Sequence, residues 1–207
     1  MPALKYTHIC VFGDSIAYGY GDTEKGGWVN RLKIELFSKN KFTEVLDVSV
    51  PGDTSRRLLD RFAREVSVRR ADIVIFAIGI NDSQYRSTPE NFLVPMAEFE
   101  QNLRKLVSQA MQFTQKIVLV GLSPVDEAKT RPIFTVTRTH YTNQNAAKYD
   151  AVVQKVAQGE GLPYVSVFGL LATADLPDGL HIAASGHAKI YLKVEQALLQ
   201  NWPDLLT

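Results

Sequence analysis

A serine, an aspartate and a histidine in this chain have the types and spacing of a nucleophile, an orienting carboxylate and a base. Ser15 follows an apolar run at residues 9–12 and a glycine, Gly13, that permits a sharp turn. Asp178 lies three residues before His181 in a Pro-Asp-Gly turn, so its carboxylate can bond one ring nitrogen and leave the other to accept the serine proton. An isolated Asp-x-x-His is more typical of a solvated turn, so the interpretation depends on the segments that accompany it.

Two further loops supply groups that could stabilise negative charge. Gly52 and Asn81 each follow a predicted strand closely, as Ser15 does. Because ligands of parallel α/β sheets bind beyond the carboxyl ends of the strands, the three residues are expected at one rim. An accessible backbone N–H and a side-chain amide beside a hydroxyl are the components of a nucleophile and its oxyanion hole.

The other three histidines are weaker candidates for the base. His8 lies within the first predicted strand and favours a structural role. His140 ends a long irregular segment and is expected at the surface. His187 falls on the last predicted helix, where a core or capping role is favoured over catalysis. His181 is therefore the predicted base.

Strand and helix patterns alternate along the chain, which predicts a parallel sheet between two layers of helices and one domain over residues 1–207. The expected strands are 7–12, 45–50, 73–78, 116–120 and a weaker 164–167. The expected helices are 27–37, 55–65, 89–111, 142–158 and 185–199. Pro95 is expected to kink the third helix or delay its start, and Ser185 is a candidate cap for the last.

The composition excludes several classes of partner. A formal net charge of +1 gives no general field for nucleic acid or an anionic membrane. No apolar run is long enough to span a membrane, and the N-terminus lacks the pattern of a secretory signal, so a cytoplasmic protein is expected. The single cysteine, Cys10, lies in an apolar run and is expected in the core.

Other motifs are incomplete. The glycines of residues 19–27 lack dinucleotide or P-loop spacing, and no two histidines have metal-ligand spacing on a helix, so no metal site is predicted. Six arginines lie between residues 56 and 70 among acidic side chains. A solvated helix face is the favoured interpretation of these arginines, and a phosphate-binding patch is the alternative.

Four segments together resemble the sequence blocks of the SGNH (GDSL-type) hydrolases. They are residues 13–16 (GDSI), 48–55 (VSVPGDTS), 79–82 (GIND) and 178–181 (DGLH), with 185–187 (SGH) following. The resemblance extends over nearly the whole chain and implies a flavodoxin-like α/β/α fold with a five-stranded parallel sheet. Ile16 replaces the leucine of the family's name, a volume-conserving change, and Asp47 stands where asparagine is frequent.

The resemblance implies a serine acyl hydrolase acting on a small-molecule ester. Ser15 would be the nucleophile, His181 the base and Asp178 the residue that orients it. The backbone N–H groups of Ser15 and Gly52 and the amide of Asn81 would form the oxyanion hole. No metal or organic cofactor is required.

The aspartates beside these residues, Asp14 and Asp82, are expected to fix the loops by hydrogen bonding. Two alternatives to hydrolysis remain: an acyltransferase that uses the same acyl-enzyme, and a non-catalytic binding module. The segments 19–27, 83–88 and 122–139 are expected to shape the pocket, with the last as a candidate rim or lid. Aromatic side chains there are Tyr18, Tyr20, Tyr85 and Phe134. No helix shows a heptad seam that would predict an oligomer.

Overall fold

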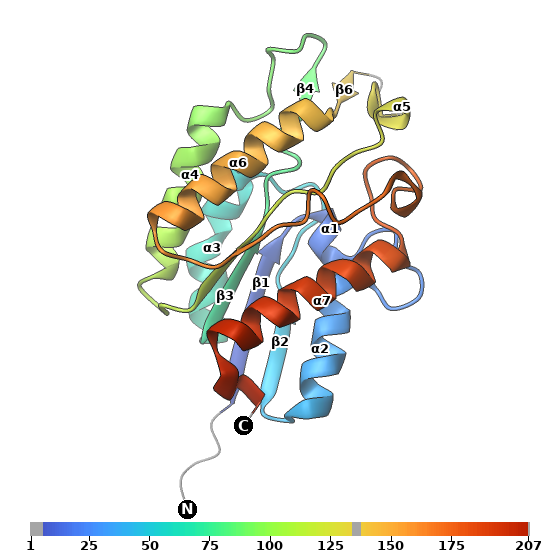
Figure 1. Ribbon diagram of the computed structural model, residues 1–207. Helices are drawn as coiled ribbons and strands as arrows, with labels where there is room; N and C mark the ends of the chain where they lie inside the picture. The colour runs from blue at the N-terminus through green and yellow to red at the C-terminus, as the bar shows by residue number, and fades with distance from the viewer. Residues whose placement is uncertain (1–5, 134–137, 207) are drawn as a thin grey trace, which may run out of the picture.

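In the computed structural model, which describes residues 6–133 and 138–206, five strands form one parallel sheet with helices on both faces (Figure 1). The strands are β1 (Thr7–Gly13), β2 (Thr43–Asp47), β3 (Ile73–Ala77), β5 (Ile117–Val120) and β7 (Tyr164–Val165). Their order across the sheet is β2-β1-β3-β5-β7. The predicted three-layer α/β/α fold with a five-stranded parallel sheet is confirmed.

The sheet separates two apolar cores because alternate side chains of each strand point to opposite faces. In β1, Ile9 and Val11 pack in one core and Cys10 and Phe12 in the other. Helices α2 (Gly27–Lys39) and α7 (Ala184–Asn201) cover the first face. Helices α3 (Ser55–Arg69), α4 (Met96–Ala110) and α6 (Asn143–Gly159) cover the second. Cys10 is fully buried, as predicted, and burial raises the pKa of its thiol to about 12.

The strand order places a crevice at the carboxyl ends of β1, β2 and β3. The chain leaves β1 to form β2 on one side and returns to form β3 on the other. Such a reversal parts the loops that follow neighbouring strands, and ligands of open α/β sheets bind there. The loops that follow these strands carry Ser15, Gly52 and Asn81.

Shorter elements lie around this edge of the sheet. They are α1 (Ser15–Tyr18), β4 (Tyr85–Arg86), α5 (Glu127–Thr130), β6 (Thr139–His140) and η1 (Thr173–Asp175), while η2 (Pro203–Leu206) ends the described chain. Strands β4 and β6 pair antiparallel and stand beyond the carboxyl edge of the sheet (Figure 1). Among the described residues, no helix has the length and apolar composition that a membrane crossing needs.

The starts of α4 and α7 test the expectations for Pro95 and Ser185. The helix expected from residue 89 begins at Met96, with Pro95 at its N-cap, so Pro95 delays the start of the helix, which is one of its two expected effects. Residues 89–95 instead lie beside β4, where Phe92 forms a bridge with Tyr85. A proline interior to the helix would remove a hydrogen bond, so the helix begins directly after it. Ser185 is not the cap of α7: the helix starts one residue earlier, and the Ser185 hydroxyl donates to Asp175 at 2.7 Å.

Candidate active site

Ser15, His181 and Asp178 form a continuous chain of contacts. His181 Nε2 lies 3.1 Å from Ser15 Oγ, and His181 Nδ1 lies 2.7 Å from Asp178 Oδ2. Ser15 is the first residue of α1, whose start is capped by Asp14: one carboxylate oxygen accepts a hydrogen bond from Ile16 N at 2.9 Å. This arrangement can pass a proton from the hydroxyl to the imidazole.

The tight approach of β1 to β3 requires a glycine before this turn. A Cβ atom at Gly13 would lie 2.7 Å from the carbonyl oxygen of Ala77 and 2.4 Å from Cβ of Ala17. A side chain at this position would therefore push α1 away from the sheet edge. Gly13 allows Ser15 to stand directly above the end of β1.

The Asp178 carboxylate is fixed by its own turn. Its Oδ1 accepts hydrogen bonds from the backbone N–H groups of Leu180 at 2.9 Å and His181 at 2.7 Å. Burial raises the pKa of this carboxyl, but the hydrogen bonds from the His181 ring and from the two backbone groups outweigh burial and hold the pKa below its usual value. An ionised Asp178 accepts the Nδ1 proton and leaves the Nε2 lone pair directed at Ser15.

Gly52 and Asn81 lie in the same cleft as Ser15 and His181. Gly52 has φ = 80°, a left-handed conformation that glycine adopts without strain. The side-chain nitrogen of Asn81 donates to Asp53 O at 2.9 Å, which engages one of its two amide hydrogens. Among the described residues the second hydrogen has no acceptor, so it can donate to a bound group.

Tyr141 fixes the orientation of the Asn81 amide, and no sequence motif pointed to it. Its hydroxyl donates to Asn81 Oδ1 at 3.1 Å and accepts from Gln84 Nε2 at 3.2 Å. Burial raises the pKa of this hydroxyl, so it remains a donor. Because Oδ1 is engaged by an O–H donor, the amide cannot flip without losing that bond. The hydrogen bonds from Gln84 to Tyr141 and from Tyr141 to Asn81 Oδ1 therefore fix the amide so that its nitrogen, rather than its oxygen, faces Asp53 O.

The other two predicted aspartates are buried beside these groups. Both oxygens of Asp82 accept from Ser55 N at 3.0 Å, and Asp82 also accepts from the Ser55 hydroxyl, so the loop after β3 is tied to the start of α3. Burial raises the pKa of Asp82 to about 6. Burial likewise raises the pKa of Asp14 to about 7, although the Ile16 backbone hydrogen bond opposes it.

We expect the Asp14→Asn variant to become more stable relative to the wild type as pH rises from about 4 to about 7. Between the unfolded and folded pKa values of Asp14, the folded state holds a proton that the unfolded state has released, so the free energy of unfolding falls with rising pH. The variant lacks this loss and keeps an acceptor for Ile16 N. Urea denaturation of both proteins across this range measures the difference, and parallel stability curves would contradict the assignment.

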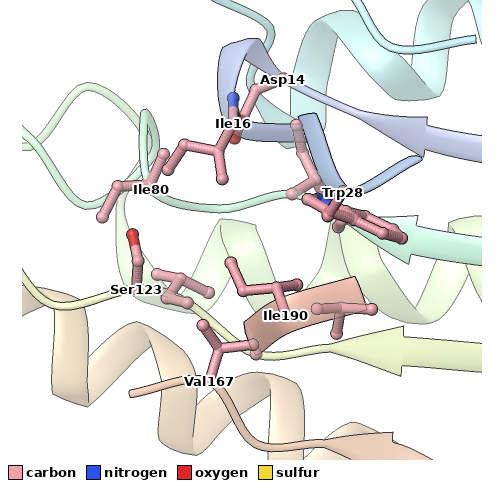
Figure 2. A pocket seen from close by; sticks show the side chains of 12 residues that line it. Asp14, Ile16, Trp28, Ile80, Ser123, Val167 and Ile190 are labelled. Carbon is pink, nitrogen blue, oxygen red and sulfur yellow. Dashed lines mark hydrogen bonds between the residues drawn. The ribbon is translucent and has the colours of Figure 1, made fainter. Parts of the chain in front are cut away.

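A small cavity lined by Asp14 and Ile16, the neighbours of Ser15 in the chain, is distinct from the cleft. Figure 2 shows its wall, which includes Asp14, Ile16, Trp28, Ile80, Ser123 and Ile190. Its volume is about 30 Å³, and the Ser123 hydroxyl on its wall has no hydrogen-bond partner among the described residues. This space admits a water molecule and is far smaller than an ordinary ligand pocket. The cavity is therefore not the substrate site.

The open cleft at Ser15 has a volume of about 730 Å³, within the range of ligand-binding pockets. Each of the three segments expected to shape it contributes to its lining, through Tyr20, Gln84, Arg86, Ile133 and Thr139. The Tyr20 ring packs against His181 with centroids 4.4 Å apart. Of the other aromatic candidates, Tyr18 and Tyr85 do not line the cleft, and Phe134 lies outside the described residues.

The remaining histidines lie away from the reacting groups. His8 is on β1, 3.8 Å from Glu44, and His140 stacks on Tyr85 with centroids 4.8 Å apart. His187 is fully buried and accepts a hydrogen bond from Trp28 N at 3.2 Å; burial lowers its pKa to about 4. In the part of the chain that the structure describes, no three His, Cys, Asp or Glu side chains gather as a metal site.

Known proteins share this sequence pattern and this fold. A model of the GDSL-like lipase/acylhydrolase family matches residues 11–189. The esterase TesA of Pseudomonas aeruginosa is 27% identical over 198 residues, covering 95% of this chain and 87% of that protein. The isoamyl acetate-hydrolyzing esterase of Saccharomyces cerevisiae is 27% identical over 237 residues, covering 98% and 97%. The structure of a lipase/acylhydrolase from Enterococcus faecalis has a TM-score of 0.78 at 21% identity, covering 94% of this chain and 96% of that one.

Proposed function

The chain belongs to the GDSL-like lipase/acylhydrolase (SGNH) family and is an esterase/acylhydrolase. We propose that it cleaves carboxylic esters through an acyl-enzyme on Ser15. The observation that carries this proposal is the pair of contacts that His181 makes, with Ser15 Oγ at 3.1 Å and with Asp178 Oδ2 at 2.7 Å. A hydroxyl, a base and a carboxylate in contact in this order form the catalytic triad of a serine hydrolase.

In the first half-reaction, Ser15 Oγ attacks the ester carbonyl while its proton passes to His181 Nε2. Asp178 stabilises the imidazolium that forms. The tetrahedral intermediate collapses as the C–O bond to the alcohol breaks, and His181 returns the proton to the departing oxygen. Ser15 then carries the acyl group. In the second half-reaction, a water molecule gives a proton to His181 and attacks the acyl carbon. The bond from that carbon to Ser15 Oγ then breaks and His181 returns the proton to Oγ, which releases the carboxylic acid and restores the Ser15 hydroxyl.

The negative charge of each tetrahedral intermediate falls on the former carbonyl oxygen. We assign its stabilisation to the backbone N–H groups of Ser15 and Gly52 and to the free amide hydrogen of Asn81. The contacts that support this role for Asn81 are the bonds from its amide to Asp53 O and from Tyr141 to its Oδ1. Both bonds hold the amide in place, so the donor needs no rearrangement when charge develops.

The proposal is tested by hydrolysis of p-nitrophenyl esters from acetate to long-chain acids, together with isoamyl acetate, the ester named in the yeast relative. We expect equal amounts of alcohol and free acid from the preferred ester. An added alcohol acceptor separates hydrolysis from transfer: formation of a new ester at the expense of free acid would support an acyltransferase. Failure of the folded protein to cleave any ester of the series would contradict the proposal.

The role of the amide is tested by comparing Asn81→Ala with Tyr141→Phe. Loss of an oxyanion donor costs about 10²–10³ in kcat. Loss of the residue that orients the donor is expected to cost about tenfold. In both variants KM should change little, because the bond is made to the transition state. Steady-state kinetics on one p-nitrophenyl ester gives both constants. A rise in KM at constant kcat would instead make Tyr141 a substrate-binding residue.

A further inference from the structure

Two arginines that have no partner among the described residues line the cleft at Ser15. Arg57 lies in the first turn of α3, five residues after Gly52, and Arg86 lies in β4, five residues after Asn81. In the described part of the chain, neither guanidinium group has a hydrogen bond or an ion pair. The charge of Arg86 reaches the Tyr141 hydroxyl, where it opposes the effect of burial on the pKa. An arginine on the cleft wall thus follows each of two proposed oxyanion donors, Gly52 and Asn81, by five residues.

Other arginines of the segment 56–70 form ion pairs with acidic side chains. Arg61 binds Asp53 at 2.8 Å, and Arg69 pairs with Glu65 along the same helix. Arg56 also lines the cleft, but its guanidinium group is engaged by Glu98, at 2.6 Å, and by Leu93 O. Arg57 differs from these three arginines because it is exposed on the cleft wall with no partner among the described residues, so the phosphate-binding alternative stays open at this position.

The charges on the cleft wall do not balance. Asp60 is the carboxylate that lines the cleft, and against it stand Arg57 and Arg86 in addition to the neutralised Arg56. A cleft with low-dielectric walls and an excess of one sign concentrates that field and attracts ligands of the opposite charge. The wall therefore favours an anion beside the reacting ester.

We propose that the cleft selects esters that carry a carboxylate or phosphate group, held by Arg57 and Arg86; this rests on the proposed hydrolysis at Ser15. A guanidinium group matches such anions with paired N–H donors, and these charge-assisted bonds are stronger than neutral ones. The anion takes no part in bond breaking. Its binding places the ester carbonyl against Ser15 and raises kcat/KM for charged substrates over neutral ones.

The test compares substrates matched in length. For an anion on the acyl side, the pair is p-nitrophenyl hexanoate and the mono-p-nitrophenyl ester of adipic acid. For an anion on the alcohol side, butyl acetate is compared with acetoxybutyrate and with acetoxypropyl phosphate. We expect the wild type to prefer the anionic member of at least one set by about tenfold or more in kcat/KM. The set that shows the preference identifies the side and the kind of anion.

The arginines are tested through the ratio of kcat/KM for the anionic and the neutral ester, which cancels a general loss of activity. Arg57→Gln and Arg86→Gln should each lower this ratio about tenfold. Arg64→Gln is the control, because Arg64 is exposed on the same helix and does not line the cleft; it should leave both rates and the ratio unchanged.

Two failures are distinguishable. Neutral esters cleaved at Ser15 with no anion preference in any set, or a preference that survives both substitutions, would overturn the role of the arginines alone. Absence of Ser15-dependent cleavage of every ester would overturn the proposed function and, with it, this inference.

Discussion

Ser15→Ala is expected to lower the kcat of p-nitrophenyl acetate hydrolysis by about 10⁵–10⁶, to a residual rate supported by the oxyanion donors and binding alone. No other hydroxyl is in contact with His181 Nε2 among the described residues, so the base has no alternative nucleophile to deprotonate. Steady-state assays of the variant and the wild type, each corrected for the rate in buffer alone, measure this loss.

The same variant should remain folded. Among the described residues, Ser15 Oγ is hydrogen-bonded only to the His181 ring, and the cap of α1 uses the Asp14 carboxylate rather than the serine hydroxyl. The midpoint of urea denaturation should therefore match that of the wild type. A folded Ser15→Ala protein that retains more than a small fraction of the wild-type kcat would remove Ser15 from the mechanism.

His181→Ala is expected to be about as severe, because the Ser15 hydroxyl then has no base in contact with it. His140→Ala is the matched control: His140 stacks on Tyr85 and does not line the cleft, so most of the activity should remain. Measuring kcat/KM over a pH series for the wild type and both variants separates loss of the base from a general loss of activity.

An alternative base would show itself in that series. If His181→Ala kept a large part of the wild-type rate with an unchanged pH profile, another group would have to accept the proton. His187 is a poor substitute, since it is fully buried and its Nδ1 is engaged by Trp28 N. A His187→Ala variant would also leave a buried cavity, which makes it a weaker control than His140→Ala.

The sequence predicted those features that depend on local residue patterns, such as the strands, the residues that follow them and the Asp178 turn. Short apolar runs rich in β-branched residues, such as residues 73–77, are typical of strands covered on both faces, and polar residues that follow parallel strands meet at one edge of the sheet. The contact between His181 and Ser15, 166 positions apart, was expected from the resemblance to the SGNH hydrolases, whose sequence blocks include both residues. The Asp178 turn is local, so its bond to His181 could be anticipated from spacing.

Other features depend on packing that no local pattern encodes. Tyr141 reaches Asn81 because β6 pairs with β4, and each strand is only two residues long. The sequence left the start of α4 open between Pro89 and the residues around Pro95, and the bridge of Phe92 with Tyr85 in β4 decides between them. The position of Arg57 on the cleft wall, which Arg64 of the same helix does not share, likewise depends on how α3 packs beside the loops.

The most direct test of the account is to find where the acyl group resides during turnover. The protein is mixed with p-nitrophenyl acetate, quenched in acid at short times and mapped by peptide mass spectrometry. The mechanism predicts an acetyl group on the peptide that contains Ser15, formed with the first equivalent of p-nitrophenol and absent in Ser15→Ala. An acetyl group on another side chain that turns over at the rate of hydrolysis would contradict it.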